Sequence, residues 1–167
     1  NAFTRLEDAL ALAPSCPNVN QNWVAEGTYR PSAIGDRSAT FRMRSGLGIY
    51  GGFAGTETAR SERAASVHVT ILSGDIGTPG DASDNSYHVV TVSGDSSALI
   101  DGCTISGGFA DGAEYAAHGG GVFSVGASPT LVNCTVRNNS CARDGAGICA
   151  YEGNLTLFNC SFQDDCD

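Results

Sequence analysis

Apolar and polar residues alternate along two segments of the chain, "PTLVNCTV" (129–136) and "NLTLFNCSF" (154–162). Alternation with a period of two is typical of a β-strand that buries one face, and it differs from the spacing of about 3.6 residues that a helix would show. Glycines and an Asn-Asn pair interrupt the pattern after a few residues. The pattern therefore predicts short strands, three to each repeated unit, joined by tight turns.

The two segments are copies of one unit, because the same residue types recur at one constant offset, as in Leu131 and Leu157. A fixed period within the range of roughly 20–50 residues indicates a solenoid, in which each repeat adds one layer to a continuous core. We predict about six such turns over residues 20–167. The side chains expected to point inward are Ile100, Ile105, Leu131, Val136, Leu157 and Phe162.

An earlier unit, "YHVVTVSGDSSALIDGCTISGG", is longer, since Cys103 lies further from Cys134 than Cys134 lies from Cys160. We interpret the longer interval as a looped insertion, "FADGAEYAAHG" (109–119), on one face of the coil.

The segment "TRLEDALALA" (4–13) follows a different pattern, which predicts a short helix. Thr4 and Glu7 have the spacing of a capping box, and Pro14 is expected to stop the run. One helical face carries Leu6, Ala9, Leu10 and Ala13. We expect residues 1–19 to form a cap over the open first turn, because solenoid ends need protection from edge pairing.

Several strings resemble a known family: "NWVAEGTYRP" (22–31), "IYGGFAGTETARSER" (49–63), "TILSGDI" (70–76), "LIDGCTISGG" (99–108) and the repeats described above. They are similar to secreted right-handed parallel β-helix proteins of the pectate-lyase-like superfamily, in particular the polymorphic-outer-membrane-protein-like surface proteins. The resemblance implies an all-β, right-handed parallel β-helix and an extracellular or cell-surface location. It does not imply one activity, because a fold alone does not specify function.

The charge of the chain limits its partners. Eighteen acidic and nine basic residues give a net charge of −9. This charge repels phosphate backbones, so we expect no nucleic-acid partner. We also expect no membrane insertion, since no apolar run approaches the roughly 20 residues that span a bilayer. Because the chain starts at Asn1 rather than Met, we interpret it as a processed or excised piece of a secreted protein.

Seven cysteines favour an oxidising compartment. Cys103, Cys134 and Cys160 occupy equivalent positions and should form a column, either with at most one bridge or as three buried thiols. Layers about 4.8 Å apart would permit such a bridge. Cys141 and Cys166 close corners one turn apart, and we expect a disulfide between them.

Asparagines recur at the corners. Asn133 and Asn159 are expected at a tight bend, where stacked side-chain amides would form an inward hydrogen-bond ladder. Both also begin glycosylation sequons, but an inward ladder would exclude a sugar there. Asn138 and Asn154 begin two further sequons at exposed turns, and they are the expected glycan acceptors.

No pair of residues with catalytic spacing is recognisable, and we expect no cofactor or transition metal. The acidic loop "SGDIGTPGDASDNS" (73–86) contains Asp75, Asp81 and Asp84, which would offer oxygen ligands to a structural Ca²⁺. The arginines nearest to an enzymatic site of the lyase type are Arg137 and Arg143, which we interpret as solvated surface residues.

These observations favour a non-enzymatic extracellular module that serves as a structural or adhesive unit of a surface protein, or as the repeating unit of a surface fibre. The alternative is a polysaccharide-binding or polysaccharide-cleaving domain, a lyase or a glycosidase. No cap follows the regular turn that ends in "FNCSFQDDCD". We therefore expect the coil to be incomplete at this end, and to be covered by further turns of a longer chain or by end-to-end association of subunits.

Overall fold

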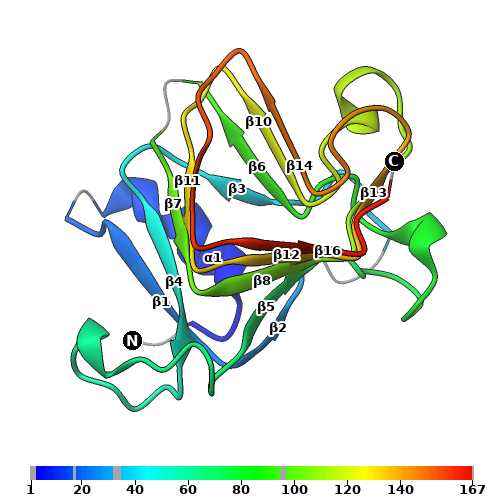
Figure 1. The fold of residues 1–167 in the computed structure, drawn as a ribbon. Helices are drawn as coiled ribbons and strands as arrows, with labels where there is room; N and C mark the ends of the chain where they lie inside the picture. Colours follow the sequence, from blue (N-terminus) through cyan, green and yellow to red (C-terminus); the bar gives the residue numbers. More distant parts are fainter. Residues whose placement is uncertain (1–2, 17, 32–34, 95–96, 167) are drawn as a thin grey trace.

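The computed structural model describes residues 3–16, 18–31, 35–94 and 97–166. They form an all-β, right-handed parallel β-helix with a short N-terminal helix, and Figure 1 looks along the coil. Sheet A contains β1 (Gln21–Ala25), β4 (Gly48–Phe53), β7 (Leu99–Asp101), β11 (Thr130–Val132) and β15 (Thr156–Phe158). Sheet B contains β2 (Gly27–Tyr29), β5 (Thr70–Ser73), β8 (Cys103–Ser106), β12 (Thr135–Arg137) and β16 (Ser161–Gln163).

Sheet C contains β3 (Phe41–Met43), β6 (Val90–Ser93), β10 (Val122–Val125) and β14 (Ile148–Tyr151). A small fourth sheet pairs β9 (Phe109–Ala110) with β13 (Ser140–Cys141). The helical elements are α1 (Leu6–Leu12), η1 (Ala13–Ser15), η2 (Arg60–Glu62), η3 (Ala82–Asp84) and η4 (Glu114–Ala117). The predicted insertion at 109–119 is thus formed by β9 and η4 at one corner.

The predicted repeat is confirmed by the strand register. Leu131 pairs with Leu157 in the following layer, at the offset of the repeat, and with Ile100 in the preceding layer, at the longer interval that includes the insertion. The described residues form five layers, as the strand order of sheets A and B shows, one fewer than the approximately six that the sequence predicts. Within the described residues the fifth layer contributes β15 and β16 but no strand to sheet C. At the other end of the coil, α1 packs against β1 and β3 of the first layer.

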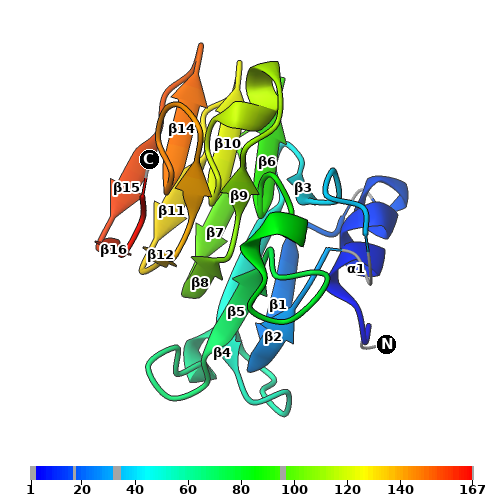
Figure 2. The ribbon, with the colours of Figure 1, turned by 90° about the vertical axis from the view of Figure 1, so that its right-hand side faces the viewer.

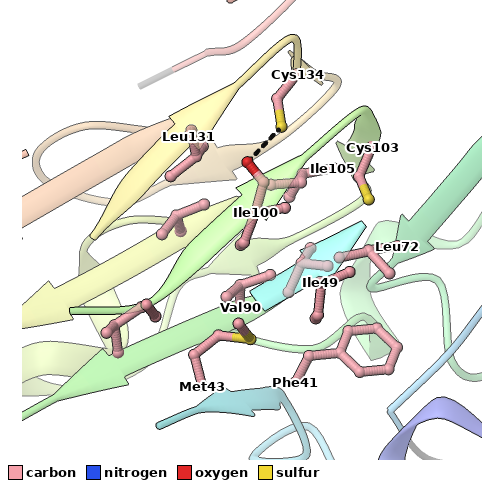
Figure 3. Close-up of a cluster of buried hydrophobic side chains, with 14 of the residues drawn as sticks. Phe41, Met43, Ile49, Leu72, Val90, Ile100, Cys103, Ile105, Leu131 and Cys134 are labelled. Atoms are coloured by element: carbon pink, nitrogen blue, oxygen red, sulfur yellow. Dashed lines mark hydrogen bonds between the residues drawn. The ribbon is translucent and has the colours of Figure 1, made fainter. Parts of the chain in front are cut away.

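The core is a set of stacked columns, one behind each sheet (Figure 3). Behind sheet A, Ile49, Ile100 and Leu131 are fully buried in consecutive layers. Burying one such side chain contributes about 1.5–3 kcal/mol. In the fifth layer the equivalent Leu157 is 42% exposed, and Phe162 behind sheet B is 49% exposed. Leu157 and Phe162 pair in register with the buried Leu131 and Val136, as the predicted inward direction requires. No described layer covers them on the other side.

Helix α1 lies at the end of the coil opposite to β14, β15 and β16 (Figure 2). It buries Leu6 and Leu10, as the apolar face predicts. The expected capping box is wrong: Arg5 is the N-cap residue, it makes no side-chain cap bond, and it pairs with Glu7. None of the helices in the described ranges is long and apolar enough to cross a membrane.

Candidate ligand-binding groove on sheet C

An aromatic cluster covers the outer face of sheet C. Along β10, Val122 and Ser124 face the core, so alternation turns Phe123 outward. Phe123 is nevertheless only 6% exposed. The insertion explains this burial, because it places η4 and its Tyr115 over the strand.

The rings contact one another directly. The ring centroids of Tyr115 and Phe123 are 5.5 Å apart with an interplanar angle of 37°, and those of Tyr115 and Tyr151 are 5.9 Å apart at 55°. Tyr115 and Tyr151 are about half exposed, whereas Phe123 is buried and contacts Tyr115. The arrangement presents two tilted tyrosine rings to solvent.

Polar groups surround this platform. The groove has a volume of about 270 Å³, and its rim includes Glu114, His118, Arg143 and Asp144. His118 Nδ1 lies 3.2 Å from a carboxylate oxygen of Asp144. Backbone hydrogen bonds fix the rim, since Gly119 donates to the Asp144 carbonyl and Arg143 donates to the Ala117 carbonyl, both at 3.1 Å. The site combines aromatic faces with both signs of charge, as ligand pockets do.

Two titratable groups lie beside the cluster. His88 stacks on Phe123, with centroids 4.9 Å apart, and its Nδ1 lies 3.0 Å from the Gly119 carbonyl oxygen. Burial lowers the pKa of His88, which favours the neutral ring as the donor to this carbonyl. Burial, and then the charge of Asp144, raises the pKa of the Cys149 thiol at the wall of the groove. Cys149 is therefore a neutral lining group.

Sequence reasoning identified only Arg143 among these residues, as a surface arginine. The aromatic cluster combines residues from an insertion, β10 and β14, and no short motif contains them. The one available signal was that alternation places Phe123 outward, where an exposed phenylalanine would need a cover.

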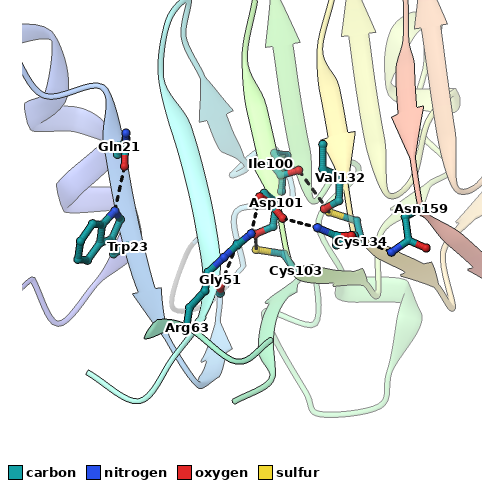
Figure 4. Close-up of polar contacts among 11 residues, drawn as sticks. Gln21, Trp23, Gly51, Arg63, Ile100, Asp101, Cys103, Val132, Cys134 and Asn159 are labelled. Carbon is teal, nitrogen blue, oxygen red and sulfur yellow. Dashed lines mark hydrogen bonds and ion pairs between the residues drawn. The ribbon is translucent and has the colours of Figure 1, made fainter. Parts of the chain in front are cut away.

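The predicted asparagine ladder lies on the surface of a corner. Asn159 Nδ2 donates to Asn133 Oδ1 at 2.7 Å, and Asn133 Nδ2 donates to Asp101 Oδ1 at 3.0 Å (Figure 4). Asn133 and Asn159 are exposed, so their expected inward direction is wrong. Both have a φ of 52°, a left-handed conformation that asparagine tolerates and that turns the chain sharply at the corner.

A buried asparagine that the sequence analysis missed lies at another corner. Asn139 is fully buried, accepts a bond from the Gly108 N–H at 3.0 Å, and donates to the carbonyl of Ile105 at 3.2 Å. It also donates to Asp165 at 3.0 Å. Asn139 and Asp165 are separated by one repeat, so their contact could have been predicted from the sequence.

The predicted cysteine column is present as thiols. Cys103 and Cys134 are buried and Cys160 is partly exposed. Cys134 Sγ donates toward the carbonyl of Ile100 at 3.5 Å, and Cys160 Sγ donates toward that of Leu131 at 3.4 Å. Each of these two thiols thus bonds to the preceding layer, and the structure forms no disulfide in the column. Burial raises the pKa of Cys103 to about 12.

The expected disulfide between Cys141 and Cys166 is also not formed. The register places Cys166 opposite Ser140, because these two residues are separated by one repeat, whereas Cys141 is the next residue along the strand. Successive side chains in a strand point to opposite sides, so this offset of one position turns the two thiols apart.

The three aspartates proposed for calcium accept separate backbone donors. Asp75 accepts from Gly80 at 3.3 Å, Asp81 from Ser83 at 2.9 Å and Asp84 from Thr78 at 2.7 Å. The described residues contain no group of three or more histidine, cysteine or acidic side chains that would hold a metal ion. The carboxylates therefore order their own loop and do not converge on one point.

Asn138 and Asn154, the expected glycan acceptors, are both exposed. Asn138 has a φ of 53° and follows β12, and Asn154 precedes β15. Their modification stays a prediction.

The comparisons with known proteins agree with this architecture. A family model described as right handed beta helix region matches residues 63–167, which is more than half of the chain. Searches of curated proteins and of solved structures find no significant match. The matched residues include β5 and every later strand, with both copies of the repeated unit. The chain belongs to the right-handed β-helix family.

Proposed function

We propose that this β-helix is a non-enzymatic extracellular adhesive module that binds a glycan in the groove over β10 and β14. The observation that carries the proposal is the pair of half-exposed tyrosines, Tyr115 and Tyr151, supported by the buried Phe123. The extracellular location rests on the similarity of the sequence to secreted surface proteins.

A sugar ring matches this groove chemically. Its apolar C–H face packs on an aromatic ring, and its hydroxyl groups need nearby donors and acceptors. Tyr115 and Tyr151 offer the ring faces, while Glu114, Arg143 and Asp144 offer acceptors and donors at the rim. The tyrosine rings are too close to each other to enclose a cation between them, because they already lie 5.9 Å apart. The arrangement favours stacking of a ring onto the surface.

The test is a binding screen of the chain against an array of neutral and acidic oligosaccharides, followed by titration calorimetry on the best ligand. Tyr115→Ala and Tyr151→Ala should each weaken binding about fivefold or more, if a sugar on a tyrosine contributes as much as a nucleobase stacked on an aromatic side chain, roughly 1–3 kcal/mol. Phe158→Ala is the matched control, because Phe158 is 68% exposed on a different sheet. Equal loss in the control would contradict the proposal.

A separate assay tests the proposal that the module does not cleave its ligand. Prolonged incubation with the bound oligosaccharide should release no new reducing ends and no unsaturated products. Product release that disappears in Asp144→Asn would show that the groove is catalytic and would replace adhesion with cleavage.

A second observation favours a structural role as well. The fifth layer holds Leu157 and Phe162 in register with buried residues of the fourth layer, yet leaves both half exposed. We propose that a further layer of parallel strands, from the same polypeptide, covers them in the native protein. Appending a copy of residues 119–144 after the fifth layer should slow amide exchange in β15 and β16. Unchanged exchange, or a doubled mass of the unmodified chain in light scattering, would contradict this source of the covering layer.

A further inference from the structure

A second groove lies at the other end of sheet C, between the N-terminal cap and the turn that follows β3. Its volume is about 680 Å³, within the range of roughly 300–1,000 Å³ that is usual for ligand sites. Arg42 and Arg44 line it, together with Asn20 and Ser45. Alternation explains the direction of Arg42, because Phe41 and Met43 on either side of it are buried.

The charge of this groove is opposite to that of the whole chain. The net charge is −9, but no described residue that lines the groove carries a carboxylate. Four arginines elsewhere in the described residues form ion pairs with acids, among them Arg63 with Asp101 and Arg37 with Asp111. Neither Arg42 nor Arg44 has an ion pair within the described part of the chain, and both are exposed.

We propose that this groove binds an organic anion that carries two oxyanion groups, sulfates or carboxylates, one at each arginine. Arg42 lies in β3 and Arg44 directly follows the end of this strand, so their Cα atoms are separated by at most about 7 Å, and their side chains can reach two charges at that spacing or wider. A guanidinium donates two parallel N–H groups to such an oxyanion and is the side chain best suited to this contact. The Ser45 hydroxyl and the Asn20 amide offer further donors at the same wall.

The site is separate from the aromatic groove. Arg42 pairs in register with Thr91 of β6, and Phe123 pairs with the same Thr91 from the other side. Two strand spacings therefore separate Arg42 from Phe123, or about 10 Å. The inference does not rest on the proposed function, and either site can fail alone.

The experiment uses sucrose octasulfate as the probe and sucrose as the neutral control, measured by titration calorimetry with the intact chain. Sucrose octasulfate should bind and sucrose should not bind at this groove. Arg42→Gln and Arg44→Gln should each weaken octasulfate binding at least fivefold, and the double variant at least twentyfold. The affinity should fall as salt rises, with a smaller salt slope in the double variant.

Arg60→Gln is the matched control, since Arg60 is exposed but lies over the ring of Tyr50, 4.7 Å from its centroid. Thermal unfolding of each variant establishes that it is folded. An equal loss in Arg60→Gln, or unchanged affinity in the double variant, would overturn the inference. If Tyr115→Ala abolishes octasulfate binding while the arginine variants do not, the anion binds in the aromatic groove, and the inference fails while the proposed function stands.

Discussion

Arg63 Nη2 lies 2.5 Å from Asp101 Oδ2, and this ion pair joins the segment after η2 to the end of β7 in the next layer (Figure 4). The same guanidinium donates to the Gly51 carbonyl at 3.3 Å. Asp101 in turn accepts from Asn133, so the exposed asparagine ladder ends on a partly buried ion pair. Three consecutive layers are linked through these side chains.

Arg63→Met should lower the free energy of unfolding by about 2 kcal/mol. Removing one partner of a fully buried pair costs roughly 3–5 kcal/mol, and the loss is smaller here because the Arg63 side chain is 19% exposed. Urea unfolding monitored by circular dichroism measures the change. Arg60→Met serves as the control and should change stability by less than about 1 kcal/mol, because it removes only an exposed contact with the ring of Tyr50. An equal effect of both variants would argue that the pair contributes nothing specific.

Asn139→Ala should lower the free energy of unfolding by more than the loss of a few buried side-chain atoms would, because it also removes hydrogen bonds. It leaves the buried Gly108 N–H without its side-chain partner and removes the bond to the Ile105 carbonyl, and an unsatisfied buried group costs about 1–3 kcal/mol. We expect the midpoint of urea unfolding to fall markedly. Asn138→Gly is the neighbouring control, because Asn138 is exposed with a φ of 53°, which glycine adopts without strain. A larger loss of stability in Asn138→Gly than in Asn139→Ala would contradict a structural role of the buried Asn139 amide.

Stability should decline as the pH falls below about 6.5, in part because of His88. Its folded-state pKa is lowered by burial, so the unfolded chain binds the proton first and acid favours unfolding. The contribution is fully present above the unfolded pKa and is lost as the pH falls toward the folded pKa. In His88→Phe, which keeps a ring beside Phe123, the free energy of unfolding should depend less on pH between 7 and 5. Identical slopes for the two proteins would exclude His88 as a source of acid sensitivity.

Ser124→Ala should stabilise the coil. Ser124 is fully buried between Val92 and Ala150 of the adjacent layers, and its hydroxyl has no hydrogen-bond partner among the described residues. Removing a buried hydroxyl without a partner should raise the free energy of unfolding by about 1 kcal/mol. Thermal unfolding tests this directly, and a lower midpoint would show that the hydroxyl contributes a favourable interaction.

The fold could be predicted from the sequence because a solenoid repeats its local information. The offset between Leu131 and Leu157 determined both register and inward face, and the insertion near Tyr115 followed from one longer interval. Whether a side chain at a corner points to the core or to solvent was harder to predict. Asn133 and Asn139 both lie at corners of the same repeated unit, but only Asn139 is buried.

The candidate groove was not predictable in the same way. Tyr115, Phe123 and Tyr151 come from three elements, and their contact depends on how η4 folds back over β10. The disulfide between Cys141 and Cys166 failed for a simpler reason, which is that its spacing departs from the repeat by a single position. Residues separated by the repeat could be predicted to contact each other in adjacent layers. Contacts between residues at other separations could be identified only in the structure.

The most direct test of the adhesive role is a nuclear magnetic resonance titration of the ¹⁵N-labelled chain with the best oligosaccharide from the array. Binding in the proposed groove should shift the amide signals of Glu114, Tyr115, Asp144 and Tyr151 in a saturable manner. Signals of the opposite corner, such as Asn133 and Asn159, should stay unchanged. Saturable shifts confined to that corner, or no shifts at any concentration of an oligosaccharide that the array retained, would contradict the proposed site.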